Sequence, residues 1–252
     1  MARHLTIITG ASRGMGLAIA EQLLDAGHEL LCISRKTNPE LEAHAVAAGM
    51  PCEQWPQDLA RPQATAERME TWLQSRANGD FETVTLINNA ALLPVVGPLE
   101  HIPLQDLEDG IRVDLEAPLL LTSSFLRATT SWKAGRKVMN ISSGLGRRAM
   151  AAQALYCAAK AGMDHFTRCV ALEEANHPNG AKVCSLAPGV IDTDMQVQLR
   201  TSDPKEFPDV AYFTGIKEQG VLASPDDAAK RVIAYLARAD FGSNPAGDIR
   251  DP

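Results

Sequence analysis

Short apolar runs alternate along the chain with longer stretches in which apolar residues recur at helical spacing. The apolar runs have the length of strands and cover residues 5–9, 29–34, 83–87, 137–142 and 181–187, with 51–55 as a weaker candidate. The stretches with helical spacing cover residues 15–26, 39–48, 104–130, 151–175 and 225–238. This alternation is typical of repeated β–α–β units. Because the strands are apolar throughout, the pattern predicts an α/β fold with a doubly wound parallel β-sheet, Rossmann-type, with helices on both faces.

Residues at the ends of the predicted helices support these boundaries. Gly27 follows the first helix, where glycine commonly ends one, and Asn38 precedes a first-turn proline. Ser224 and Asp227 form a capping box for the last helix. Residues 200–223 contain prolines and glycines without a clean periodicity. We expect them to form a long irregular segment that acts as a lid over the substrate.

The length and composition favour one domain. A chain of 252 residues with 45% hydrophobic and 22% charged residues can build a sizeable core without disulfides or structural metal. The sequence has no linker-like segment, no internal repeat and no low-complexity tract. A single domain over residues 1–252 is therefore predicted.

The charge balance argues against two classes of partner. The chain has 24 Lys and Arg against 31 Asp and Glu, a net charge of −7. That charge opposes attraction to nucleic acids and anionic lipids, and the apolar start of the chain is too short for a signal peptide or a membrane span. Five scattered cysteines suit reduced thiols, and the six histidines lack metal spacing. We expect a cytoplasmic protein without metal, nucleic-acid or membrane partners.

A glycine-rich loop follows the first predicted strand. Residues 9–16 read TGASRGMG and lead directly into the helix at 15–26. Glycines let the backbone approach a pyrophosphate, and the free N–H groups of the helix start favour the anion. A tight strand-to-helix turn is the alternative, but the position at the first β–α junction favours dinucleotide binding. The loop residues predicted to bind the cofactor are Gly10, Ser12, Arg13, Gly14, Met15 and Gly16.

The end of the second strand indicates which dinucleotide binds. A site that prefers NAD has an acidic residue there, whereas this chain has Ser34, Arg35 and Lys36. Arg13 lies beside this position in such a fold, and two guanidinium groups suit a phosphate monoester. A solvated strand end is the alternative for the basic residues. The absent acid favours NADP(H) as the cofactor.

Further along the chain, three residues together could form a site that donates a proton to a substrate. Tyr156 and Lys160 are four residues apart in a predicted helix and share a face, so the ammonium group can lower the pKa of the phenol. Ser143 follows the strand at 137–142, at the end where α/β sheets place their sites. A surface pair on a helix would explain Tyr156 and Lys160 alone. With Ser143 the three suggest general-acid chemistry.

The chain resembles the short-chain dehydrogenase/reductase family of the classical type. The glycine loop is followed in the family's order by NNAA (88–91), NISS (140–143), YCAAK (156–160) and PGVIDTDM (188–195). The local context is similar to the branch that contains sepiapterin reductase and benzil reductase. The resemblance implies that Ser143 orients a substrate carbonyl, Tyr156 protonates its oxygen, and Lys160 holds the nicotinamide ribose. It also implies a homodimer or homotetramer.

The family's sequence pattern implies further cofactor-binding positions, and this chain departs from the pattern at one position. The resemblance implies that Asp58 and Leu59 border the adenine and that Asn89 and Ala90 border its ribose. The turn expected to pass the nicotinamide contains Pro188, Gly189, Val190 and Thr193. Asp114 stands where the family usually completes its catalytic set with asparagine. It is interpreted as a tolerated near-isostere, with an altered proton relay or a loss of activity as the alternatives.

Three segments should line the substrate side. Residues 92–99, 145–155 and 190–223 are largely apolar apart from Arg147 and Arg148, which suggests a compact carbonyl compound with hydrophobic parts. By resemblance, the first choice of reaction is NADPH-dependent reduction of a 1,2-dicarbonyl to the alcohol. Two alternatives remain, which are a 3-oxoacyl-thioester reductase and an inert NADPH-binding regulatory protein.

Overall fold

The computed structural model describes residues 2–76 and 80–251 as one α/β domain built on a parallel sheet. The strands are β1 (Arg3–Thr9), β2 (His28–Ser34), β3 (Cys52–Pro56), β4 (Phe81–Asn88), β5 (Gly135–Ile141), β6 (Lys182–Ala187) and β7 (Ala246–Asp248). Their order in the sheet is β3-β2-β1-β4-β5-β6-β7, and all pair in parallel. This order reverses direction between β1 and β4, the place where doubly wound folds bind their ligands. The predicted fold class is confirmed.

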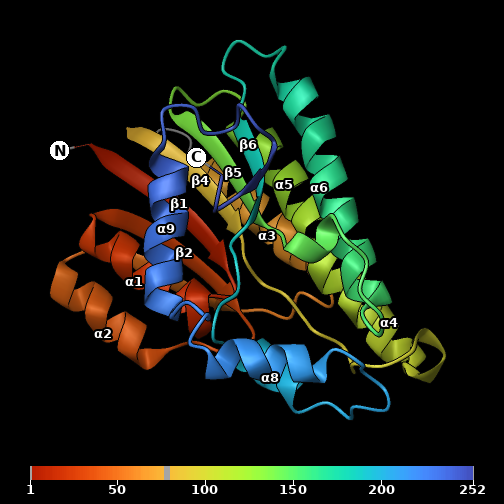
Figure 1. Cartoon of the computed structure of the whole chain (residues 1–252). Coiled ribbons are helices and arrows are strands. Elements are labelled where there is room, and N and C mark those ends of the chain that lie inside the picture. Colours follow the sequence, from red (N-terminus) through yellow and green to blue (C-terminus); the bar gives the residue numbers. More distant parts are fainter. Residues whose placement is uncertain (1, 77–79, 252) are drawn as a thin grey trace.

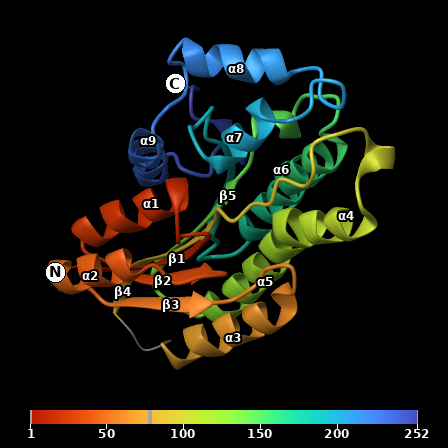
Figure 2. The same cartoon turned by 90° about the horizontal axis from the view of Figure 1, so that it is seen from below.

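Helices cover both faces of the sheet (Figures 1 and 2). The longer ones are α1 (Gly14–Asp25), α2 (Pro39–Ala48), α3 (Pro62–Ser75), α4 (Leu104–Ile111), α5 (Ala117–Thr129), α6 (Ala154–Glu174), α7 (Asp194–Arg200), α8 (Val210–Glu218) and α9 (Pro225–Ala237). Short helical turns are η1 (Leu99–His101), η2 (Arg112–Glu116) and η3 (Gly144–Gly146). Helices α1, α2 and α9 lie on one face, and α3, α5 and α6 on the other (Figure 2). Among the described residues, no helix is long and apolar enough to cross a membrane.

Two apolar clusters hold these layers together. One joins the sheet to α1 and α9 through residues such as Ile19, Leu23 and Val232, and the other joins it to α3 and α5 through Met69 and Phe125. All five of these side chains are 2% exposed or less. Because both faces of the central strands are buried, those strands need apolar residues at every position, as the sequence has them.

The structure corrects several expectations about the elements. Helices α3 and α7 and strand β7 were not expected, and the helix at 104–130 is interrupted by a π-helical turn, η2. The helix expected from residue 151 begins at Ala154. The segment at 200–223 is not irregular throughout, because α8 forms within it. Helix α8 lies beyond the carboxyl ends of the strands (Figure 1).

Candidate active site

The glycine loop makes the turn that its sequence predicts. Gly10 and Gly14 have φ angles of 71° and 58°, in the left-handed region that glycine adopts without strain. A Cβ atom on Gly16 would lie 2.2 Å from the carbonyl oxygen of Gly10, and one on Gly10 would lie 2.9 Å from the Cα of Ala90. Three of the glycines are therefore required by the backbone itself, which brings β1, α1 and the end of β4 together.

The start of α1 can accept an anion. Its N-cap residue, Arg13, has an extended backbone and makes no side-chain capping hydrogen bond. The N–H groups of the first turn are therefore left for a ligand, as dinucleotide sites require. The Asn38 side chain fixes the backbone of Ser12 by donating a hydrogen bond of 3.1 Å to the Ser12 carbonyl oxygen. The Met15 side chain is buried in the core, so this residue can offer a cofactor its backbone alone.

The basic residues around the loop are not arranged as expected. Arg13 does not turn toward Arg35 but forms an exposed ion pair with Asp194, at the start of α7. Arg35 is exposed at the end of β2 and has no ion pair among the described residues. Beside it, the hydroxyl of Ser34 is buried without a hydrogen-bond partner in the part of the chain that the structure describes. The exposed guanidinium of Arg35 fits the phosphate group of a dinucleotide, whereas the buried Ser34 hydroxyl does not face a ligand.

Asn89 holds the glycine loop in place. Its side-chain amide donates hydrogen bonds to the carbonyl oxygens of Thr9 (3.0 Å) and Gly10 (3.2 Å). The N–H groups of Asn89 and Ala90 both donate to the Thr9 hydroxyl at 3.0 Å. This positioning role was missed in the sequence, because it depends on β1 and β4 being neighbours in the sheet.

The predicted adenine contacts lie just beyond β3. Asp58 is exposed, and its carboxylate accepts a hydrogen bond of 3.0 Å from the N–H of Ala60. The side chain of Leu59 is buried in the apolar cluster beneath. Asp58 therefore has an oxygen free to face solvent or a ligand, whereas the Leu59 side chain belongs to the core.

The turn after β6 faces the glycine loop. Gly189 has a φ of 85°, and a Cβ on Gly14 would lie 3.8 Å from the Thr193 methyl group. Pro188 is half-buried, and Val190 packs against the apolar cluster that contains Tyr156. The structure thus places the predicted nicotinamide turn next to the glycine loop.

Ser143, Tyr156 and Lys160 meet at the carboxyl end of β5. Ser143 begins the turn η3, where its hydroxyl accepts a hydrogen bond of 3.1 Å from Leu145 N–H. Lys160 is 1% exposed, and its ammonium group donates to the Ile141 carbonyl at 3.0 Å. The Lys160 nitrogen lies 5.4 Å from the centre of the Tyr156 ring. The three predicted residues therefore form one cluster, and Ser142 is turned into the protein, where its hydroxyl is buried.

The acidity of Tyr156 differs from the expectation. Burial raises the pKa of its phenol, the Asp114 carboxylate raises it further, and Ser143 lowers it. The expected lowering of this pKa by Lys160 is not found, because the ammonium group is directed to the Ile141 carbonyl and burial of the phenol is the largest effect. Tyr156 consequently keeps its proton at neutral pH, which a proton donor requires.

Asp114 lies inside the π-helical turn between α4 and α5. It is 1% exposed, and one carboxylate oxygen accepts a hydrogen bond of 2.7 Å from Leu92 N–H. The other oxygen has no partner among the described residues. Burial raises the pKa of Asp114 to about 6, although Lys160 and the Leu92 N–H lower it. The wider turn thus places a carboxyl group that titrates near neutral pH beside the ammonium group of Lys160.

Arg147 belongs to a network behind the site. It was expected on the substrate side, but its side chain donates to Asp164 (3.1 Å) and to the Gly247 carbonyl of β7 (2.8 Å). Asp164 also accepts a hydrogen bond of 2.6 Å from the Ser185 hydroxyl. Asp164 and Asp114 both raise the pKa of Lys160, whereas burial lowers it and is the larger effect. The sequence did not reveal Asp164, which lies four residues after Lys160 and one helical turn along the same face.

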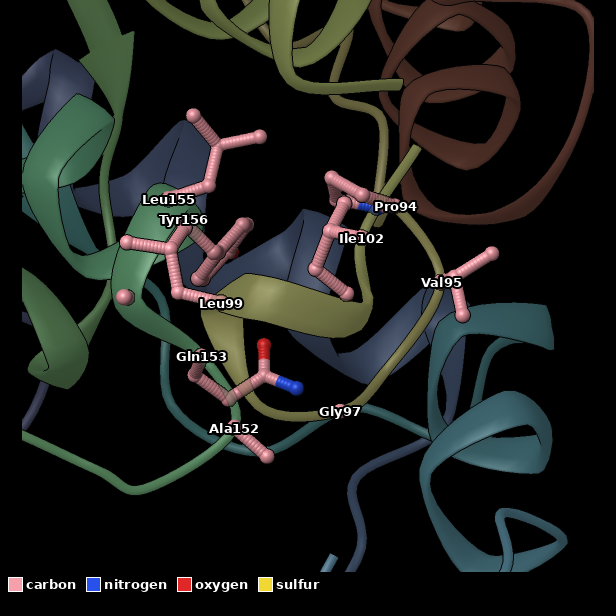
Figure 3. A pocket seen from close by; sticks show the side chains of 10 residues that line it. Pro94, Val95, Gly97, Leu99, Ile102, Ala152, Gln153, Leu155 and Tyr156 are labelled. Carbon is pink, nitrogen blue, oxygen red and sulfur yellow. The ribbon is translucent and has the colours of Figure 1, made fainter. Parts of the chain in front are cut away.

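A pocket opens beside Tyr156 (Figure 3). Its walls come from the segment after β4, from η1 and from the start of α6. The segments expected to line the substrate side also share an apolar cluster that consists of Leu93, Val96, Tyr156, Leu199, Phe207, Phe213 and Ile216. An apolar hollow next to a buried proton donor suits a carbonyl compound with hydrophobic substituents.

Comparisons with known proteins identify the family of the chain. Residues 4–204 match the family model described as short chain dehydrogenase. A benzil reductase ((S)-benzoin forming) of Bacillus cereus is 35% identical over 96% of both chains, and a sepiapterin reductase of Mus musculus is 30% identical over 97% of this chain and 96% of its own. The crystal structure of a metagenomic short-chain oxidoreductase in complex with NADP is 28% identical, with a TM-score of 0.73, and the match covers 97% of this chain and 94% of that one. The chain therefore belongs to the short chain dehydrogenase family of oxidoreductases, which use a nicotinamide dinucleotide.

Proposed function

We propose that the protein is an NADPH-dependent reductase that converts one carbonyl of a small, partly apolar 1,2-dicarbonyl to the alcohol. The observation that carries this proposal is the buried, protonated hydroxyl of Tyr156 at the wall of an apolar pocket, beside Ser143. The similarity to benzil reductases supports the choice of a vicinal diketone.

Each residue of the cluster has a distinct part in this reaction. Tyr156 donates its proton to the carbonyl oxygen, and Ser143 donates a hydrogen bond that orients the same oxygen. Lys160, held by the Ile141 carbonyl, binds the ribose next to the nicotinamide. The chemistry that a bound dihydronicotinamide would supply is a hydride for the carbonyl carbon. Two donors that converge on one oxygen also stabilise its developing negative charge, by about 3–4 kcal/mol for each donor.

The preference for NADPH rests on the residues at the end of β2. Arg35 is exposed and free to bind a 2′-phosphate, and no acidic residue occupies that strand end. Arg13 exchanges its contact with Asp194 for the phosphate. Each charge-assisted contact is worth roughly 1.5–3 kcal/mol, so NADPH should bind at least about tenfold more tightly than NADH.

Replacing both arginines by alanine tests the cofactor preference. The double variant should weaken NADPH binding and leave NADH binding nearly unchanged, because NADH lacks the phosphate. Titration of cofactor fluorescence measures both dissociation constants. Equal affinities for the two cofactors in the unmodified protein would contradict the assignment.

An anaerobic screen tests the reaction itself. Oxidation of NADPH is followed with diketones, quinones and 3-oxoacyl thioesters, with each cofactor in turn. The proposal predicts the highest kcat/KM for 1,2-diketones. A clear preference for 3-oxoacyl thioesters would instead assign the protein to thioester reduction, and NADPH binding without turnover of any carbonyl compound would make it a regulatory protein.

A further inference from the structure

The pocket beside Tyr156 is apolar on nearly every side (Figure 3). Side chains that give it this character are those of Pro94, Val95, Leu99, Ile102 and Leu155. Among its lining residues, Tyr156 and Gln153 alone bring polar side-chain atoms. The role of Tyr156 follows from the reaction, whereas Gln153 has none in the mechanism above.

Gln153 is buried without a partner for its amide. The residue is 4% exposed, and its side chain makes no hydrogen bond with any residue that the structure describes. Figure 3 shows the amide directed into the pocket. A side-chain amide has two donor hydrogens and an acceptor oxygen. Neither of its polar atoms is enclosed by protein, so the small part of Gln153 that stays accessible includes the amide, which is open to the pocket. A ligand in the pocket is therefore the natural partner of this amide.

The backbone before Gln153 is strained. Ala152 has a φ of 59°, and within residues 2–76 and 80–251 it is the one non-glycine residue with a positive φ. Such a conformation is unfavourable for a residue with a Cβ atom and persists where the surroundings impose it, often at ligand sites. The Ala152 carbonyl accepts a hydrogen bond of 3.4 Å from Gly97 N–H on the opposite wall. This turn directs the chain so that Gln153 caps α6, three residues before Tyr156.

We propose that Gln153 determines specificity by binding the second oxygen of a vicinal dicarbonyl. Its amide N–H donates a hydrogen bond to the neighbouring carbonyl while Tyr156 and Ser143 bind the carbonyl that is reduced. This inference rests on the proposed function and adds to it a second point of contact, which a monoketone cannot use. Because Gln153 is the N-cap residue of the helix that carries Tyr156, the distance between the two contacts is held by the backbone.

A paired comparison of substrates and variants tests this role. Benzil and deoxybenzoin share one carbon skeleton, and deoxybenzoin lacks the second carbonyl oxygen. Gln153→Met keeps the length of the side chain and removes the donor. We expect it to lower kcat/KM for benzil about five- to tenfold and to change kcat/KM for deoxybenzoin less than about twofold. Where deoxybenzoin turns over too slowly, its inhibition constant against benzil replaces kcat/KM.

A control variant separates hydrogen bonding from packing. Leu155→Met alters the same pocket with little change of volume or polarity, so it should affect both substrates alike. Equal losses on both substrates with Gln153→Met, or no loss on either, would overturn the role of Gln153 while leaving the proposed function intact. If the unmodified protein reduces neither compound, the proposed function itself fails and this inference fails with it.

Discussion

Asp114→Asn removes a buried charge without changing the size of the side chain. In the native protein the Asp114 carboxyl is 1% exposed, and burial raises its pKa from the ordinary 3.8 to about 6. The unfolded chain ionises this group near 3.8, so below that value both states bind the proton. Between pH 3.8 and pH 6 the unfolded state loses the proton first. Asp114 therefore contributes stability at low pH that is lost as the pH rises through about 6.

The size of this effect follows from the two pKa values. A difference of about 2.2 between them corresponds to roughly 3 kcal/mol, because each pKa unit is worth about 1.4 kcal/mol. About 2 kcal/mol of this lies between pH 4.5 and pH 7.5, where unfolding can be measured conveniently. The asparagine variant lacks the titration. The variant also loses the attraction between Asp114 and Lys160. This loss offsets part of the stability that the variant gains at neutral pH by burying no ionised carboxylate.

Reversible urea unfolding of both proteins across this pH range measures the effect. The free energy of unfolding of Asp114→Asn, relative to the unmodified protein, should increase by about 2 kcal/mol from pH 4.5 to pH 7.5. The comparison cancels the titration of all groups whose pKa does not depend on Asp114. A difference that stays constant with pH would refute the reasoning, since it would mean that Asp114 titrates alike in the folded and unfolded states.

The same substitution should change the pH dependence of catalysis. The Asp114 carboxylate raises the pKa of Tyr156, so its removal lowers that pKa. A general acid must be protonated, and a lower pKa therefore moves the basic limb of the kcat/KM profile to lower pH. We expect Asp114→Asn to keep its fold and most of its activity. An unchanged basic limb would show that the carboxylate does not act on Tyr156.

Three further substitutions test the site and the fold. Lys160→Met should weaken cofactor binding and lower turnover at least about a hundredfold, measured by cofactor titration and steady-state kinetics; full activity would exclude Lys160 from the mechanism. Gly16→Ala should abolish cofactor binding or destabilise the fold, because its Cβ would lie 2.2 Å from the Gly10 carbonyl oxygen, and a variant with normal binding and melting temperature would contradict that geometry. Glu174→Ala should lower the free energy of unfolding by about 3–5 kcal/mol, since it leaves the buried Arg136 guanidinium without its ion-pair partner; a loss under 1 kcal/mol in urea unfolding would disprove this.

The parallel sheet could be predicted because its strands are buried on both faces and are therefore apolar at successive positions. Helix α3 was not predicted, because its sequence has no clear apolar pattern. Its buried face includes Thr65 and Ala66, and its N-cap residue, Arg61, has no capping side chain, so neither its periodicity nor its start was evident. Strand β7 is three residues long and has the sequence AGD, which has no strand propensity of its own and depends on pairing with β6.

Some features of the site could likewise be predicted from the sequence, and others could not. Tyr156, Lys160 and the glycine loop were evident because their spacing within a helix or a turn determines which side chains meet. The π-helical turn around Asp114 and the left-handed conformation of Ala152 were not evident, since both are imposed by contacts with distant segments. The pairing of Arg13 with Asp194 joins residues 181 positions apart and likewise depends on tertiary structure.

The most direct test of the central claim is the rate of NADPH oxidation with benzil in the unmodified protein and in Tyr156→Phe, at saturating cofactor. Removing the hydroxyl leaves the aromatic ring in its buried place and takes away the proton donor. Turnover should fall by about a hundredfold to ten-thousandfold, while the dissociation constant for NADPH changes less than about twofold. Unchanged turnover in Tyr156→Phe would contradict the assignment of Tyr156 as the acid that protonates the substrate carbonyl.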